Sequence, residues 1–135
     1  MRTKLFAIVA AVGLELAAAP GLAHHAFAAE FDQNKPIKVQ GAVTKWELTN
    51  PHSWIYIDVK GGDGKMVTWM IEGASPNNLY RLGLTKESLP AGSEITVEGY
   101  QAKDGSTRAV GRNITFANGK KFFLGLMEAE GAPKQ

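Results

Sequence analysis

Three histidines are the residues of this chain with the clearest capacity for chemistry. His24 and His25 are adjacent, and His52 lies in the sequence Asn50-Pro51-His52-Ser53. If export cleaves the chain after Ala23, His24 becomes the first residue, and its free α-amine and its imidazole together chelate one metal ion. His52 would add a second imidazole if the fold brings it to the same ion. The sequence therefore raises the question of a nitrogen-ligand metal site.

Copper is the metal that such a set of ligands favours, because it binds nitrogen most tightly among the divalent first-row metals and accepts planar arrangements. The chain has no cysteine, which excludes thiolate sites. The arrangement resembles the histidine brace of exported copper proteins, with His24 as the chelating residue and His52 or His25 as the second imidazole. Adjacent side chains of an extended segment point to opposite sides, so we favour His52. Glu30 and Asp32 could supply an axial oxygen or an acceptor that orients a histidine.

The same residues also allow an interpretation without a metal. His24 and His25 would then belong to a solvated arm, and His52 would cap a turn. The alternative function is a binding or interaction module that uses an aromatic surface for a small solute, a glycan or a protein partner. Trp54 and Tyr56 are the candidates for this surface, because they alternate with isoleucines along a predicted strand and so face away from the core.

Composition and motifs exclude several other classes. A chain of 135 residues is long enough for one domain, and a net charge of +2 lacks the basic excess that nucleic acids require. We find no Gly-x-Ser-x-Gly nucleophile elbow, no phosphate-binding glycine loop and no spacing that pairs two carboxylates. We therefore expect a binding protein rather than an enzyme, with no nucleic-acid partner.

Residues 1–23 have the pattern of a secretory signal peptide. Arg2 and Lys4 precede an apolar run from Leu5 to Leu14, and small residues stand at the usual cleavage positions in Gly21-Leu22-Ala23. The apolar run is too short to cross a membrane as a helix. We therefore expect a periplasmic protein that keeps no integral membrane segment after cleavage.

The rest of the chain reads as a succession of β-strands. Alternating apolar residues and turn signals predict strands over 37–49, 54–60, 65–72, 94–102, 107–117 and 121–124, with a turn over 33–36. In the first strand the apolar positions change sides, which predicts a bulge or bend near 41–45. Ser75, Pro76 and Gly83 predict a short helix whose buried edge is Leu79 and Leu82.

This order of elements predicts an all-β domain with one short helix, a five-to-six-stranded OB-fold-like Greek-key barrel. We place an N-terminal arm at 24–35, the barrel at 36–127 and a flexible tail at 128–135. In an OB-fold the loop between the first two strands lies on the ligand-binding side, which would place His52 there.

Four segments resemble a family of small exported bacterial proteins classed as domain of unknown function 6152. They are His24-His25-Ala26-Phe27-Ala28-Ala29-Glu30-Phe31-Asp32, Thr49-Asn50-Pro51-His52, Glu72-Gly73-Ala74-Ser75-Pro76-Asn77 and Val97-Glu98-Gly99-Tyr100. The resemblance covers essentially the whole chain after the signal peptide. It implies a periplasmic, β-rich, OB-like domain, and it implies no activity, catalytic residue or ligand.

Overall fold

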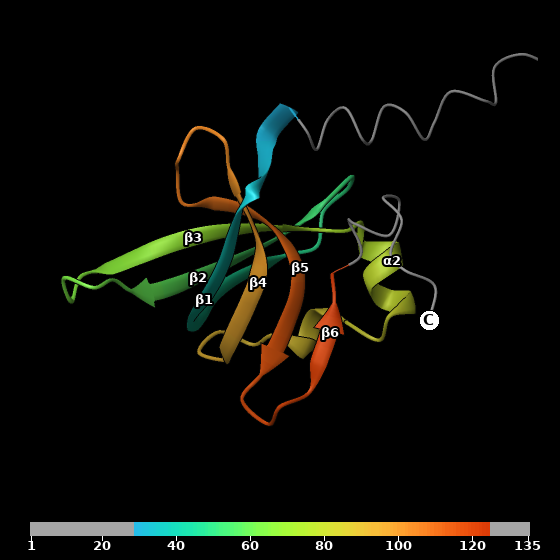
Figure 1. Ribbon diagram of the computed structural model, residues 1–135. Helices are drawn as coiled ribbons and strands as arrows, with labels where there is room; N and C mark the ends of the chain where they lie inside the picture. Colours follow the sequence, from blue (N-terminus) through green and yellow to red (C-terminus); the bar gives the residue numbers. More distant parts are fainter. Residues whose placement is uncertain (1–28, 125–135) are drawn as a thin grey trace, which may run out of the picture.

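A computed structural model describes residues 29–124 of the chain, and Figure 1 shows their arrangement. Six strands form one sheet in the order β3-β2-β1-β4-β5-β6. The strands are β1 (Phe31–Glu47), β2 (Ser53–Lys60), β3 (Met66–Gly73), β4 (Glu94–Ala102), β5 (Arg108–Phe116) and β6 (Lys121–Phe123). A short helix, α2 (Pro76–Arg81), and a 3-10 turn, η1 (Lys86–Ser88), connect β3 to β4. The predicted signal peptide, His24, His25 and the predicted tail lie outside the described residues.

The sheet closes into a ring through a pairing between β3 and β5. This pairing is parallel and joins Met70 to Arg108, Ile71 to Ala109 and Glu72 to Val110. The pairings between the other neighbouring strands are antiparallel. A closed ring of strands with one short helix confirms the prediction of an OB-fold-like barrel. Within residues 29–124 no helix is long and apolar enough to cross a membrane.

The core fills the inside of this ring and follows the predicted alternation along the strands. Its fully buried members come from the longer strands, from the β3–β4 connection and from the residue after β6; the larger ones are Val43, Ile55, Ile57, Ile71, Leu79, Leu84, Ile95, Val97, Ile114 and Leu124. The prediction that Leu82 lies on the buried edge of the helix is wrong, because α2 ends at Arg81 and Leu82 is its exposed C-cap residue. Leu84 lies in the core instead, and its backbone N–H donates to the carbonyl of Leu79 at 2.9 Å.

The first strand differs from its prediction at its start. β1 begins at Phe31, and the turn predicted over 33–36 is wrong, because these residues continue the strand. The pairing with β4 shifts register between Phe31 and Pro36, so the irregularity is absorbed as a bulge in a continuous strand. Phe31 is buried against Ala102 and Val110, and this apolar contact stabilises the first residues of β1.

The bend predicted in the same strand is confirmed. The register between β1 and β2 shifts between Val43 and Lys45. Just before this shift, Gly41 passes so close to β2 that an added Cβ atom would lie 2.1 Å from the carbonyl oxygen of Asp58. Only glycine fits this crossing, and the crossing turns β1 from one part of the barrel to the other.

Candidate functional site

His52 lies at the end of the loop that connects β1 to β2, directly before the first residue of β2. The loop contains a cis peptide bond between Asn50 and Pro51. The Thr49 hydroxyl donates a hydrogen bond to the His52 carbonyl at 3.2 Å, and the Ser53 N–H donates to the carbonyl of Ala74 at 3.1 Å. Hydrogen bonds on both sides therefore fix the backbone of His52 beside the end of β3.

The side chain of His52 is paired with that of Glu72. The Nδ1 atom of the imidazole is in direct contact with Oε1 of the carboxylate. The side chain of Glu72 is only 9% exposed, whereas that of His52 is 41% exposed. Because Glu72 engages Nδ1, the nitrogen left for any further partner is Nε2. A carboxylate that holds one ring nitrogen in this way fixes the tautomer and the orientation of the ring.

Burial is the main influence on the acidity of Glu72. It raises the pKa of the carboxyl group above 4.5, and nearby Glu30 raises it further. His52 and Arg108 act in the opposite direction, because positive charge beside a carboxylate favours its ionised form. The raised pKa marks Glu72 as a buried group held by specific partners, the pattern in which perturbed acids accompany functional sites.

Arg108, the first residue of β5, completes this cluster. Its Nη2 atom lies 3.4 Å from Oε2 of Glu30, and its guanidinium lies over the ring of Trp54, 5.6 Å from the ring centroid. Trp54 pairs directly with Glu72 across β2 and β3. The cluster therefore contains His52, Glu72, Arg108, Trp54 and Glu30, and it lies where β3 and β5 close the ring.

The start of the described chain is held at the same place. The Glu30 carbonyl accepts a hydrogen bond from the backbone N–H of Lys103 at 2.9 Å, in addition to the contact of its side chain with Arg108. The described part of the chain therefore begins beside Arg108 and Lys103. In Figure 1 the start of β1 lies near the β4–β5 turn and the start of β5.

Trp54 and Tyr56, the residues predicted to form an aromatic surface, share one face of β2, and both are half-buried. The Tyr56 hydroxyl donates to Oε2 of Glu47 at 3.1 Å, and Nζ of Lys45 lies over the Tyr56 ring at 5.4 Å from its centroid. Burial and the hydrogen bond to Glu47 raise the pKa of Tyr56. Each of the two rings therefore already carries a cation of the same chain on one face.

The carboxylates predicted as partners of a histidine have other roles. Glu30 contacts Arg108, and Oδ1 of Asp32 accepts a hydrogen bond from the backbone N–H of Asn34 at 2.9 Å. The acceptor at His52 is Glu72 rather than Glu30 or Asp32. A role of either carboxylate toward His24 or His25 lies outside the described residues. Among residues 29–124 no group of three or more histidine, aspartate or glutamate side chains could hold a metal ion.

Sequence reasoning missed Glu72 and Arg108, but one signal for Glu72 was present. The tight turn at Gly61-Gly62-Asp63-Gly64 fixes the pairing of β2 with β3, which sets Ser53 opposite Gly73. If the same register continues by one residue beyond Ser53, His52 lies beside the end of β3 and close to Glu72. No comparable signal existed for Arg108, because the parallel pairing that brings β5 to β3 follows from closure of the ring.

Comparison with known families identifies the chain. Comparison with curated protein sequences gives no match. The family of unknown function DUF6152 matches the chain over residues 12–112, a range that includes His24, His25, His52, Glu72 and Arg108. This range is well over half of the 135 residues. The chain therefore belongs to the DUF6152 family, as its four resembling segments predict.

Proposed function

We propose that this protein is an exported periplasmic protein that binds a copper ion through Nε2 of His52 and through the amine and imidazole of His24. In this proposal a peptidase removes residues 1–23, and His25 serves as the alternative second imidazole. Two imidazoles and one amine form a set of nitrogen ligands. Among the divalent first-row metals, Cu(II) binds such ligands most tightly.

The observation that carries the proposal is the pairing of His52 with Glu72. Metal-binding histidines usually donate their second ring N–H to a carboxylate or a carbonyl, which fixes the tautomer and makes the ligating nitrogen more basic. Here Nδ1 contacts a nearly buried carboxylate while the imidazole as a whole is well exposed. A histidine that only caps a turn needs no such partner, because hydrogen bonds from the Thr49 hydroxyl and from the Ser53 N–H already hold the loop.

Chain geometry also supports the participation of His24. Glu30 is held beside the cluster by Arg108 and by the Lys103 N–H. His24 precedes Glu30 by six positions, and an extended chain of that length spans about 20 Å at most. A short series of contacts joins Glu30 to His52: Arg108 contacts Glu30 and lies over Trp54. Trp54 is paired with Glu72, which contacts His52.

The proposal is tested by calorimetric titration of Cu(II) into protein that begins at His24. We expect one tight site per chain, and we expect His52→Ala to weaken binding by about 100-fold or more through the loss of one nitrogen ligand. Glu72→Gln should weaken it by about 10- to 100-fold, because it alters the group that orients the ring.

A matched control isolates the terminal amine. Protein with one additional methionine before His24 keeps all three histidines but cannot form the chelate, so its affinity should fall to that of simple imidazole binding. Equal affinity of the two forms would contradict the role of the amine. Mass spectrometry of protein taken from the periplasm, with its metal content measured in the same sample, tests the cleavage after Ala23.

A further inference from the structure

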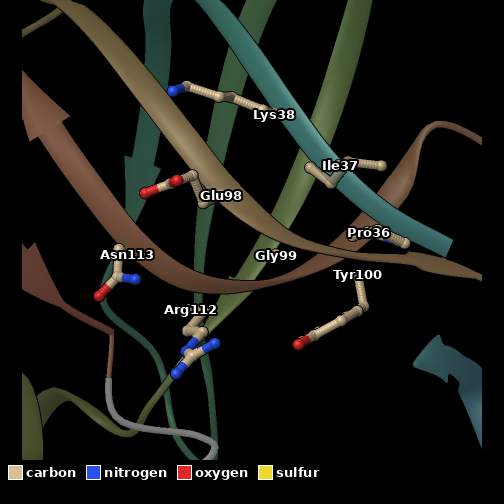
Figure 2. A pocket seen from close by; sticks show the side chains of 8 residues that line it. All are labelled: Pro36, Ile37, Lys38, Glu98, Gly99, Tyr100, Arg112 and Asn113. Atoms are coloured by element: carbon tan, nitrogen blue, oxygen red, sulfur yellow. The ribbon is translucent and has the colours of Figure 1, made fainter. Parts of the chain in front are cut away.

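A hollow on the outer face of the barrel is lined by residues other than those of the His52 cluster. It has a volume of about 390 Å³ and is lined by Pro36, Ile37, Lys38, Glu98, Gly99, Tyr100, Arg112 and Asn113. Figure 2 shows that these residues come from three adjacent strands, β1, β4 and β5, and that Tyr100 and Arg112 extend to the same side of the sheet. The volume falls in the range of small-molecule sites, which is about 300–1,000 Å³.

A β-bulge creates the hollow. Glu98 pairs with Asn113, whereas the next residue of β4, Gly99, pairs with Gly111, so Arg112 is an extra residue in β5. A bulge of this kind turns a side chain out of the regular alternation. The bulge also requires glycine at position 99, because an added Cβ atom there would lie 2.0 Å from the carbonyl oxygen of Val110. The backbone is therefore shaped to direct Arg112 outward at this point.

The charges that line the hollow leave an excess of positive charge. Its single carboxylate, Glu98, is already bound by Lys121, whose Nζ lies 3.0 Å from Oε2, and this hydrogen bond lowers the pKa of Glu98. Lys38 and Arg112 also act on Glu98 electrostatically, but within residues 29–124 neither has a carboxylate at ion-pair distance. Among the described residues, two cations therefore line the hollow without a carboxylate at ion-pair distance.

The uncharged lining adds a second requirement for a ligand. Tyr100 contributes an aromatic ring, and Pro36 and Ile37 contribute apolar surface on the other strand. A guanidinium pairs best with a planar, bidentate anion such as a carboxylate. The ionised Glu98 at the edge disfavours a polyanion, because each further negative charge would be repelled.

We propose that this hollow binds a small organic monocarboxylate with an aromatic or aliphatic body. Arg112 and Lys38 hold the carboxylate, and Tyr100, Pro36 and Ile37 contact the apolar part of the ligand. The proposal is independent of copper binding, since it shares no residue with the His52 cluster.

The test is an NMR titration of the isotopically labelled full chain with benzoate and with cyclohexanecarboxylate. We expect saturable shifts of the backbone amides of Lys38, Gly99 and Asn113. Benzyl alcohol, which has a similar body and no charge, should bind at least about tenfold more weakly, because a charge-assisted hydrogen bond is lost. Inorganic phosphate should also bind more weakly, because it lacks the apolar part.

Variants assign the roles of individual side chains. Arg112→Gln should weaken benzoate binding by about tenfold, and Lys38→Gln, at an exposed position that leaves the bulge intact, should weaken it by a smaller factor. Glu98→Gln should strengthen it by about threefold through the loss of a like charge. Arg81→Gln, the same substitution on α2, should have no effect. The proposal is overturned if benzoate causes no saturable shifts, if benzyl alcohol binds equally well, or if both Arg112→Gln and Lys38→Gln leave the affinity unchanged.

Discussion

Arg108 at the start of β5 contacts Glu30, which precedes it by 78 positions in the chain, through a 3.4 Å approach of Nη2 to Oε2. The same guanidinium lies over Trp54 and contributes to the electrostatic environment of Glu72. One arginine therefore joins the segment that leads to the N-terminal histidines to the strands that hold His52. This relationship makes Arg108 the first residue to test.

Arg108→Gln should loosen the start of β1 with little effect on the whole fold. An exposed ion pair and a cation–π contact together contribute about 1 kcal/mol, so the free energy of unfolding should fall by no more than about that amount. The amide of Lys103, which donates to the carbonyl of Glu30, should exchange its hydrogen several-fold faster. Lys121→Gln, which removes the ion pair with Glu98, is the control, and equal exchange at Lys103 in both variants would contradict the anchoring role.

Glu72→Gln should change the pH dependence of stability. The folded state raises the pKa of Glu72 above 4.5, so it binds this proton more tightly than the unfolded chain does. Stability must then fall as pH rises from 4.5 through the raised value, because ionisation of the buried carboxyl is opposed only in the folded state. A glutamine has no such proton. The stability of Glu72→Gln relative to the unaltered protein should therefore increase as pH rises through this interval.

Urea denaturation at a series of pH values measures this difference. Glu87→Gln, which removes an exposed carboxylate on η1, is the control for the loss of one charge. The prediction is contradicted if the difference in free energy of unfolding between Glu72→Gln and the unaltered protein stays constant with pH. It is also contradicted if the stability of Glu72→Gln relative to the unaltered protein decreases as pH rises. Either result would show that burial does not control the acidity of Glu72.

The proposed copper binding should weaken as the pH falls. Amine and imidazole nitrogens bind a metal only after losing their protons, so protons and copper compete for the same atoms. Titration calorimetry in buffers with different ionisation enthalpies should detect proton release on binding. Fewer protons should be released in His52→Ala than in the unaltered protein. An affinity that does not depend on pH would argue against a nitrogen site.

Gly41→Ala should be strongly destabilising. The added methyl group would lie 2.1 Å from the carbonyl oxygen and 2.8 Å from the carbonyl carbon of Asp58, and both are backbone atoms that cannot move aside as a side chain does. Overpacking of this kind costs about 1–3 kcal/mol or more. Gly62→Ala is the matched control, because no atom lies within 4 Å of its added Cβ. Its effect should stay within about 0.5 kcal/mol, and equal losses in the two variants would contradict the close crossing.

The sequence predicted the fold well because its signals are local. Turn residues bound each strand, and the alternation of apolar residues matched the buried positions; β4 was predicted over the same residues, 94–102, that it occupies. The prediction failed at Pro36, where a turn-forming residue lies within a strand. Such a residue is tolerated there because the register shift between Phe31 and Pro36 accommodates it.

The site was harder to predict because it depends on contacts between distant segments. The loop position of His52 followed from the order of the elements, but its acceptor did not. Glu72 alternates with core residues along β3 and reads in sequence as an outward carboxylate. Its burial comes from the packing of the loop and of β5 around it, which no periodicity encodes. For Arg112, the sequence showed only that the alternation of apolar and polar residues along β5 breaks next to Gly111.

The parallel pairing of β3 with β5 also has a consequence for the order of folding. Met70 and Arg108 are separated by a helix, a strand and several turns, so their contact carries a larger loss of chain entropy than any hairpin does. The hairpin of β2 and β3 can bring His52 to Glu72 early, from local contacts alone. Trp54 comes into place with the same hairpin, whereas enclosure of the pair by Arg108 must await the arrival of β5. The folding chain would thus form its histidine–carboxylate pair first and complete the surroundings of that pair last.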